Sequence, residues 1–350
     1  MKIEKSKCLR VPLRETEKVR KILIIKDLIN NNFKLIKKGN FVYFPVYNFV
    51  NEFRNYKICK REFEKKDKKI KSFKDITKIS NTFKSQLPQS FDIIGNILLI
   101  KLPSDLLNFK KEIGNALLET HKNINTVCLT YPVSGELRTR KIEVISGVKK
   151  TETIHKEYGL EFFLDIKKTY FSPRLSSERK RITDMVKSNE TIVDMFAGIA
   201  PFSIMIAKYQ NPKIIYAIDK NKYAIKFAKE NIKRNKVLDK VETICADSKK
   251  IISIMEKKGK KADRIIMNLP FSANLFFKYA LGIIGKKAVI HYYDIVKENN
   301  IDKKIEELKK IAKDYHFILS NLDIRKIKTY APREFYIGID ITAKRINMPM

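Results

Sequence analysis

The sequence predicts an α/β protein whose C-terminal half is a doubly wound, mostly parallel sheet that closes with an antiparallel strand. Four short segments rich in β-branched residues alternate with helix-like segments, and each carries a polar residue at or beside its carboxyl end. Because parallel strands place their carboxyl ends at one edge of a sheet, these polar groups should line one crevice. The strands are 191–195, 214–218, 241–246 and 264–267, and their polar residues are Asp194, Asp219, Asp247 and Asn268.

The loop after the first strand indicates a nucleoside-binding site. It runs from Phe196 to Pro201 with Gly198 as its one glycine. Glycine lets the backbone approach a ligand closely, and an acid about 20–25 residues further on, here Asp219, can bind both hydroxyls of a ribose. A nicotinamide dinucleotide would need three glycines and a pyrophosphate seat. The loop therefore suits a nucleoside without a pyrophosphate, and we expect S-adenosylmethionine as the cofactor.

The other strand ends complete this predicted cofactor site. Asp247, or the backbone beside it at Ser248, should face the adenine, whereas Asp194 and the backbone from Phe196 through Ala197 to Gly198 should lie near the amino-acid end. A plainer alternative stays open, because any parallel sheet can end its strands in aspartate. The ordered series of strand ends favours the cofactor site.

Length and charge indicate a multidomain protein with a polyanionic partner. At about 100–150 residues per domain, 350 residues allow two or three domains. The 73 Lys and Arg residues exceed the 39 Asp and Glu residues, and the net charge of +34 opposes compactness. Because the basic residues are spread over the whole chain, nucleic acid is favoured over a membrane surface. A lysine-rich genomic composition is the alternative explanation.

Cysteine and histidine usage gives no sign of a metal site or a disulfide framework. The four cysteines and four histidines are scattered without paired spacing, so we expect neither. The N-terminal residues are charged, and no apolar run approaches about 18 residues. We therefore expect a cytoplasmic protein with no membrane segment.

Residues 1–64 are predicted to form a small α/β domain. A helix at 16–30 and a hairpin around 38–40 are its main elements. The lysine-dense stretch 57–78 is either a solvated linker or a strap that contacts phosphates, and its centre, 65–71, is expected to be a basic linker.

A second domain is predicted over 72–168, and the cofactor domain follows over 169–350. In the second domain, the loop 134–140 between two strands holds two arginines. The cofactor domain should open with a helix capped by Ser176 or Ser177. The remaining predicted elements are strands at 91–100 (two, joined by a turn), 126–130, 142–145 and 288–293, helices at 103–121, 222–235 and 301–313, a hairpin at 152–166 that turns at Tyr158 and Gly159, and an antiparallel pair at 317–328 and 335–342.

Several short motifs combine polar and aromatic residues. They are Thr153-Ile154-His155-Lys156-Glu157, Tyr170 to Arg174, Asp194-Met195-Phe196-Ala197-Gly198, Asn268-Leu269-Pro270, His291-Tyr292-Tyr293 and Tyr330-Ala331-Pro332-Arg333-Glu334. Together they resemble the archaeal and eukaryotic tRNA (guanine-37-N1)-methyltransferases, and the resemblance covers nearly the whole chain. It implies a Rossmann-like class I methyltransferase domain that uses S-adenosylmethionine. It also implies a middle domain that holds the anticodon stem-loop and an N-terminal domain that checks tRNA shape.

The resemblance places the family's catalytic arginine at Arg138 and its catalytic carboxylate at Glu178. Guanine N1 carries a proton at neutral pH, and a nearby carboxylate could remove it as general base. Negative charge then develops on O6, which a guanidinium would stabilise. Without the resemblance, Glu178 would be interpreted as an acid at a helix N-terminus and Arg138 as a surface arginine.

Further site residues follow from the same resemblance. Asn268 would hold the guanine edge or the methionyl part of the cofactor, and Tyr170 would pack near the flipped target base. Arg174, Tyr330 and Arg333 would contact RNA. The cofactor set implied is Arg179, Asp194, Phe196, Ala197, Gly198, Asp219, Lys220, Asp247, Ser248, Asn268 and Pro270.

Two residues depart from the family pattern. Ala200 stands where a second glycine is common, and Phe271 follows Pro270 where a lysine is often found. The first change is small, whereas the second could alter contacts with RNA or near the methyl group.

Alternative functions stay open. The chain could transfer the aminocarboxypropyl group of the same cofactor to a wyosine precursor on tRNA, although Arg138 and Glu178 argue against it. It could instead methylate a wyosine intermediate, or an exocyclic amine of RNA, since Asn268 to Phe271 loosely resembles an N-P-P-Y loop. A non-catalytic tRNA-binding protein is the alternative from a different class. We expect a monomer whose partner is tRNA, contacted through the anticodon stem-loop and the body.

Overall fold

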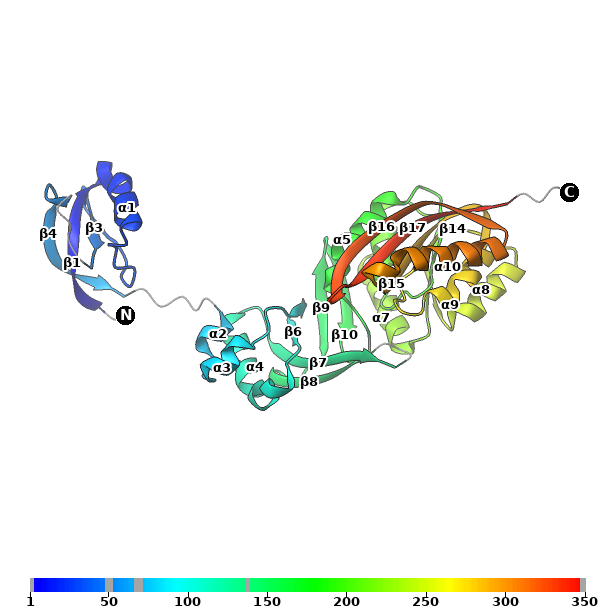
Figure 1. Ribbon diagram of the computed structural model, residues 1–350, viewed down its shortest axis with the longest axis horizontal. Helices are drawn as coiled ribbons and strands as arrows, with labels where there is room; N and C mark the ends of the chain where they lie inside the picture. The colour runs from blue at the N-terminus through cyan, green and yellow to red at the C-terminus, as the bar shows by residue number, and fades with distance from the viewer. Residues whose placement is uncertain (1–2, 48–52, 66–71, 136–138, 347–350) are drawn as a thin grey trace. The chain divides into compact units, whose positions relative to one another are not determined.

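The computed structural model describes residues 3–47, 53–65, 72–135 and 139–346. The chain forms two compact units, Met1–Ile76 and Thr77–Met350 (Figure 1). Within the described ranges, none of the helices is long and apolar enough to cross a membrane. The division into three domains and a linker stays a prediction.

The first unit is a four-stranded antiparallel sheet with helix α1 packed on it. Strand β1 lies between β3 and β4, and β2 pairs with β3. A hairpin turns at Gly39 as predicted, with a φ of 56° that glycine adopts without strain. The bounds in this unit are β1 Ile3–Pro12, η1 Leu13–Glu15, α1 Thr16–Ile25, β2 Ile36–Lys38, β3 Phe41–Pro45, β4 Lys57–Glu64 and α2 Phe73–Ile76.

Two predictions for this unit are wrong. Helix α1 ends at Ile25, before the predicted end at residue 30. Residues 57–64, expected to belong to a linker or strap, form β4 and pair with β1 along its length. The basic composition of β4 does not indicate a strand, because Phe63 is the side chain of β4 that is fully buried. The partner strand β1 lies at the other end of this unit's sequence.

The second unit begins with a mixed four-stranded sheet in the order β5-β6-β7-β8. Helix α4 packs against β8, and Gly114 allows the close approach, because an added Cβ would lie 2.9 Å from the Ser146 Cβ. The predicted helix at 103–121 is a 3₁₀ segment followed by α4. The bounds are α3 Asn81–Ser85, β5 Asp92–Ile94, β6 Ile97–Ile100, η3 Ser104–Phe109, α4 Lys110–Thr120, β7 Thr126–Ser134 and β8 Thr139–Gly147.

The predicted hairpin is present as β9 Glu152–Glu157 and β10 Leu160–Asp165. It turns at Tyr158 and Gly159, whose φ values are 46° and 74°. The side chains of Asn231 in helix α7 (Lys222–Arg234) and of Asn235 just after this helix hydrogen bond to the backbone of β10. The hairpin therefore docks onto the large sheet domain through backbone polar groups that it would otherwise leave unpaired.

The rest of this unit is a seven-stranded sheet in the order β13-β12-β11-β14-β15-β17-β16 (Figure 1). The first five strands in this order, β13-β12-β11-β14-β15, are parallel to one another. Strand β17 runs antiparallel to both β15 and β16. The strand order reverses direction between β11 and β14, which is where open α/β sheets bind ligands. The strand bounds are β11 Thr191–Asp194, β12 Ile214–Asp219, β13 Val241–Cys245, β14 Ala262–Met267, β15 Ile284–Lys297, β16 Phe317–Ala331 and β17 Glu334–Arg345.

Helices cover both faces of this sheet, which confirms the predicted doubly wound α/β fold. Successive residues of a strand point to opposite faces, so Ile192 and Ile266 join the core beneath α5, α6 and α7, whereas Val193 and Ile265 join the core beneath α8, α9 and α10. The remaining bounds are η4 Pro173–Leu175, α5 Ser176–Met185, α6 Pro201–Tyr209, α7 Lys222–Arg234, α8 Ser248–Lys257, α9 Asn274–Gly282, η5 Glu298–Asn300 and α10 Ile301–Asp314.

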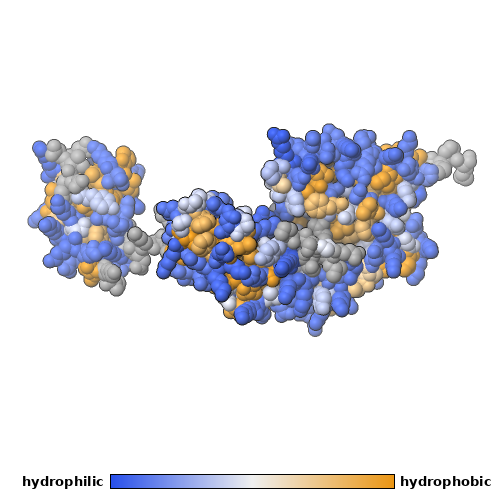
Figure 2. Space-filling view, turned by 60° about the horizontal axis from the view of Figure 1, so that its bottom comes forward, coloured by the Kyte–Doolittle hydropathy of each residue, from blue (hydrophilic) through white to orange (hydrophobic). Residues whose placement is uncertain are grey.

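The predicted serine cap of α5 is wrong. Helix α5 begins at Ser176 itself, and its N-cap is the apolar residue Leu175. The reason is the 3₁₀ turn at Pro173–Leu175, which leads into α5 and positions its first residues. On the face seen in Figure 2, the surface is mainly hydrophilic, with hydrophobic residues in small groups, as the charged composition leads one to expect.

Candidate active site

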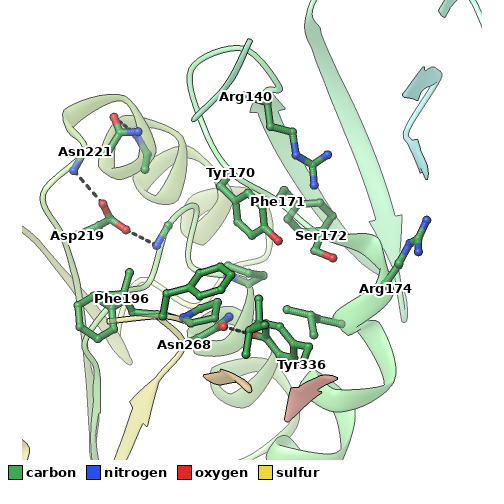
Figure 3. A pocket seen from close by; sticks show the side chains of 18 of the residues that line it. Arg140, Tyr170, Phe171, Ser172, Arg174, Phe196, Asp219, Asn221, Asn268 and Tyr336 are labelled. Atoms are coloured by element: carbon green, nitrogen blue, oxygen red, sulfur yellow. Dashed lines mark hydrogen bonds between the residues drawn. The ribbon is translucent and has the colours of Figure 1, made fainter. Parts of the chain in front are cut away.

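A cavity of about 920 Å³ lies at the carboxyl ends of the parallel strands. Pockets that enclose drug-sized ligands have volumes of roughly 300–1,000 Å³. Figure 3 shows Asp219 and Asn221 at one side of this cavity, Arg140 and Arg174 at the other, and Tyr170 between them. One side therefore offers a carboxylate and the other offers guanidinium groups.

Asp219 organises the loop that follows β11. Its Oδ2 accepts a hydrogen bond from the Gly198 backbone N–H at 2.7 Å, and its Oδ1 accepts one from the Asn221 N–H at 2.8 Å (Figure 3). Burial raises the pKa of this carboxyl, and the two backbone N–H groups oppose the shift. Each oxygen keeps a second lone pair, so Asp219 can accept hydrogen bonds from a diol in the cavity.

The loop between β11 and α6 keeps its backbone open to the cavity. Gly198 has a φ of 57°, and an added Cβ would meet nothing closer than the Tyr170 carbonyl oxygen at 3.8 Å. Glycine is therefore required by the left-handed backbone and not by packing against protein. Ala200 has a φ of 62°, in the left-handed region where glycine is favoured. A residue with a Cβ, such as alanine, adopts this backbone conformation at a cost of roughly 1–2 kcal/mol.

The predicted adenine end is built from the start of α8. Asp247 caps this helix by accepting a hydrogen bond from the Lys249 N–H at 2.8 Å. The Ser248 hydroxyl donates to the Met195 carbonyl and so ties α8 to the end of β11. Phe196 packs edge-to-face against Phe276 at 4.9 Å between ring centroids. Asp247, Ser248 and Phe196 all line the cavity, so an apolar face and polar atoms meet there.

Asn268 lies on the cavity floor at the end of β14. The Tyr336 hydroxyl from β17 donates a hydrogen bond to the Asn268 Oδ1 (Figure 3). This bond holds the amide so that its NH₂ group stays a donor for a ligand. Pro270 also lines the cavity, as do Lys220 and Ala197.

Basic and aromatic residues form the other side. Arg174 donates to Asp92 at 2.6 Å, and Arg140 lies 3.9 Å from the same carboxylate. The Arg140 guanidinium lies over the Tyr170 ring, 5.3 Å from its centroid. Burial, with the charges of Arg174 and Arg140, lowers the pKa of Lys328 on β16. Among the described residues at this side, the carboxylate of Asp92 therefore stands against the basic side chains of Arg140, Arg174 and Lys328, which favours a negatively charged ligand.

Arg179 lines the cavity but is engaged by protein. Its guanidinium is buried and donates to both carboxylate oxygens of Glu157 and to the Ser172 carbonyl. A bidentate pair of this kind fixes the guanidinium in place. Arg179 therefore braces hairpin β9–β10 against the segment that carries Tyr170.

Asp194 lies outside the cavity lining, although its strand ends there. Its side chain is buried, and the Ser203 hydroxyl of α6 donates to its Oδ2 at 2.9 Å. Burial is the main cause that raises the pKa of Asp194 to about 7. The carboxyl therefore supports the loop from behind and does not face the cavity.

Glu178 also lies outside the lining, at the end of a buried chain of charges. It accepts two hydrogen bonds from Arg181, at 2.9 and 2.7 Å, and one from the Tyr293 hydroxyl at 2.9 Å. Burial works to raise the pKa of Glu178, but these bonds and the charges of Arg181 and Arg325 outweigh it and lower the pKa. Glu178 is therefore ionised and firmly held.

The chain of charges continues away from Glu178. Arg181 also donates to Asp340 at 2.7 Å, which accepts from His291 Nδ1 at 2.6 Å. Because an arginine cannot accept, Arg264 donates to His291 Nε2 at 2.7 Å, and the neutral ring carries its proton on Nδ1. Arg264 finally pairs with Glu190 at 2.6 Å. Glu178 and Glu190 are thus joined by a continuous series of hydrogen bonds and ion pairs.

Most of the predicted site residues meet in the cavity, and some do not. Tyr330 lines it, whereas Arg333 is exposed in the turn between β16 and β17. Arg138 lies outside the described residues. The structure adds cavity residues that the sequence interpretation missed. Asn221 could have been found from its place just after a strand end, and Arg140 from its place in the loop with two arginines, whereas Lys328 and Tyr336 have no local signal.

Three family descriptions match consecutive parts of the chain. Residues 8–54 match the tRNA methyltransferase 5 N-terminal domain, residues 76–151 the TYW2 N-terminal domain, and residues 153–320 the TRM5/TYW2 methyltransferase domain. Among relatives, the tRNA (guanine(37)-N(1))-methyltransferase Trm5b of Pyrococcus abyssi is 40% identical over 95% of this chain and 97% of its own length. The tRNA(Phe) (4-demethylwyosine(37)-C(7)) aminocarboxypropyltransferase of Methanocaldococcus jannaschii is 40% identical over 62% of this chain and 85% of its own.

Solved structures show the same fold. A complex of aTrm5 with tRNALeu superposes with a TM-score of 0.78 at 34% identity, covering 97% of this chain and 99% of that one. Methanocaldococcus jannaschii Trm5 in complex with adenosine superposes with a TM-score of 0.65 at 34% identity, covering 98% of this chain and all of that one. Sequence and fold agree over almost the full length, and the chain belongs to the TRM5/TYW2 methyltransferase family.

Proposed function

We propose that this protein transfers the methyl group of S-adenosylmethionine to N1 of guanine 37 in tRNA. The observation that carries the proposal is the single cavity that joins the carboxylate of Asp219 to the aromatic and cationic side formed by Tyr170, Arg140 and Arg174. One side suits the ribose of a nucleoside cofactor, and the other suits a base attached to phosphates.

The residues at the strand ends fit the cofactor. Asp219 would bind the ribose hydroxyls, the open backbone from Phe196 to Gly198 would lie near the amino-acid end, and Asp247 would contact the adenine. When bound, S-adenosylmethionine supplies an electrophilic methyl group on a sulfonium. The structure of a relative with adenosine supports this assignment.

The target base must leave its stack to enter the cavity. Tyr170 offers it an aromatic face, which would offset the unstacking cost of a few kcal/mol. Asn268, held by Tyr336, would donate from its NH₂ group to an acceptor on the base or cofactor. The basic side would hold the adjoining phosphates, and the relative's complex with tRNALeu supports an RNA partner.

Glu178 would act as general base on N1, and Arg138 would stabilise the negative charge that develops on O6. The lowered pKa of Glu178 keeps it ionised at neutral pH, as a base must be. Because Glu178 is not among the residues that line the cavity, RNA binding would have to bring the base and the carboxylate together. Catalytic hydrogen bonds of this kind often tighten only in the complex with substrate.

Paired variants test the general base. Glu178→Gln should lower the rate of methyl transfer about 10²-fold or more with cofactor affinity retained. Glu190→Gln is the matched control, because Glu190 is the carboxylate at the other end of the same chain of charges and is held by Arg264. Equal losses in both variants would show that the chain of charges is structural only. Arg138→Ala should likewise abolish transfer, and full activity would remove Arg138 from the mechanism.

The reaction itself is tested with labelled S-adenosylmethionine and two unmodified tRNA transcripts, one with guanine and one with adenine at position 37. Label recovered as N1-methylguanosine from the first transcript alone would support the proposal. Label in both transcripts, or in neither, would contradict it.

A second candidate is supported by the wyosine-pathway relative, which is 40% identical to this chain over 218 residues. In its favour, that enzyme uses the same tRNA position. Against it, the relative aligns with only 62% of this chain, whereas residues 8–54 match the tRNA methyltransferase 5 N-terminal domain. Partly modified tRNA carrying the wyosine intermediate distinguishes the two when the label is in the aminocarboxypropyl group of S-adenosylmethionine, because a methyl label would leave with methylthioadenosine. The aminocarboxypropyltransferase would label this tRNA and leave the unmodified transcript unlabelled.

A further inference from the structure

Phe271 has an unusual backbone conformation at the mouth of the cavity. It follows Asn268-Leu269-Pro270 and has a φ of 72°, in the left-handed region that a bulky side chain rarely adopts. Its ring lines the cavity, yet 55% of the residue surface is exposed. A bulky residue in this backbone region is strained, and such strain concentrates at functional sites.

Buried polar groups hold Phe271 in this conformation. Its backbone N–H donates to the Asp294 Oδ1 at 2.9 Å. Asp294 is buried and is itself held by the Tyr292 hydroxyl at 3.0 Å and by Lys304 at 3.4 Å. The surrounding structure therefore fixes the direction of this loop, and the ring does not depend on a ligand for its position.

Tyr330 supplies a second exposed ring at the same place. It comes from the end of β16, is 54% exposed, and also lines the cavity. The two rings meet edge-to-face with their centroids 5.5 Å apart. Two elements distant in sequence thus place an aromatic pair, which we call the rim pair, beside the cavity.

We propose that the rim pair, Phe271 and Tyr330, is a stacking site for the unpaired nucleobase next to the target base in the RNA loop. This inference rests on the proposed function. When one base enters the cavity, its neighbour is held at the mouth by the shared backbone and has lost a stacking partner. An exposed aromatic face restores that partner for any base.

The surroundings favour a nucleobase over an apolar protein side chain. Lys328 and Arg174 line the same cavity, and cations beside exposed rings are the usual composition of sites for single-stranded nucleic acid. Stacking does not read hydrogen-bond patterns, so the rim pair should strengthen binding of the loop with little preference among bases.

The test measures tRNA affinity of the full chain with three transcripts: an intact one with guanine 37, one with an abasic nucleotide at position 36, and one with an abasic nucleotide at position 38. Phe271→Asn is the main variant, because asparagine tolerates a positive φ and so removes the ring without adding backbone strain. Phe271→Tyr retains the ring. Tyr330→Ala and Tyr330→Phe form the matching pair on the other element.

We expect Phe271→Asn to weaken binding of intact tRNA roughly 5- to 100-fold, the range for loss of one stacked base. One of the two abasic transcripts should bind the wild type equally weakly and should lose nothing more with Phe271→Asn. Phe271→Tyr and Tyr330→Phe should bind intact tRNA within about twofold of the wild type.

Three results would overturn the inference. The first is unchanged tRNA affinity in Phe271→Asn and Tyr330→Ala, and the second is a loss from Phe271→Asn that adds to the loss from each of the two abasic transcripts. The third is a loss of cofactor affinity that accounts for the whole decrease in tRNA affinity. Failure of the proposed function is separate, because wild-type methyl transfer to guanine 37 is measured on the same intact transcript. Transfer without an effect of the rim pair rejects only the inference, and absent transfer rejects the proposed function.

Discussion

Asp194→Asn should make the folded protein less sensitive to rising pH. Burial is the main cause that raises the pKa of this carboxyl from 3.8 to about 7, and the nearby charge of Asp219 adds to the shift. Between these two values the folded protein keeps a proton that the unfolded chain has released. The stability from this group is therefore complete below pH 3.8 and is lost as the pH rises to about 7.

The size of the effect follows from the shift. One pKa unit corresponds to about 1.36 kcal/mol, so the rise from 3.8 to about 7 amounts to a loss of ~4 kcal/mol in the free energy of unfolding. Roughly half of this loss, ~2 kcal/mol, falls between about pH 5.5 and pH 8. Asparagine has the same shape and does not ionise, so the variant lacks this decline. For a domain of 150–250 residues the difference corresponds to roughly 4–8 °C in Tm.

Calorimetry of the wild type and the variant at several pH values measures this difference. Titrating groups that do not interact with Asp194 cancel when the two Tm curves are subtracted, so the gap should move in favour of Asp194→Asn as the pH rises. Asp184→Asn, at an exposed carboxylate paired with Lys180, is the matched control and should follow the wild type. Parallel curves for the wild type and Asp194→Asn would refute the raised pKa and the argument built on burial.

Three further predictions concern the cofactor, the backbone and the RNA. Asp219→Asn should weaken cofactor binding roughly 10- to 100-fold in equilibrium dialysis, because charge-assisted hydrogen bonds contribute about 1.5–3 kcal/mol; unchanged binding would place the ribose elsewhere. Gly95→Ala should destabilise the protein far more than Gly39→Ala in urea unfolding. Both glycines have a φ of 56°, but only at Gly95 would a Cβ collide with protein, 2.1 Å from the Thr153 hydroxyl; equal losses would contradict the clash. tRNA binding should weaken steeply with salt, and Arg174→Ala should reduce the slope of log K against log[salt] by about 1; an unchanged slope would mean that Arg174 contacts no phosphate.

The sequence alone determined the sheet, its strand ends and the cofactor loop. These features are local: β-branched runs, helix-period runs and a single glycine followed by an acid at the next strand end are read within about 30 residues. These local patterns therefore predict Asp219, Gly198 and Asn268, which all line the cavity. The family was equally readable, because its motifs keep their order along the chain.

Only the tertiary structure decided which way the polar groups face and what they meet. Asp194 and Glu178 carry the right chemistry in the right segments, yet one supports the loop from behind and the other ends a buried chain of charges. The cavity also takes Arg140 from the second sheet and Lys328 and Tyr336 from the last two strands. A strand's local pattern does not reveal which distant segments will pack beside it, because those contacts depend on how whole elements cover one another. For the same reason, strand β4 depends on its pairing with β1, and the rim pair depends on the end of β16 lying beside Phe271. Neither contact has a local pattern in the sequence.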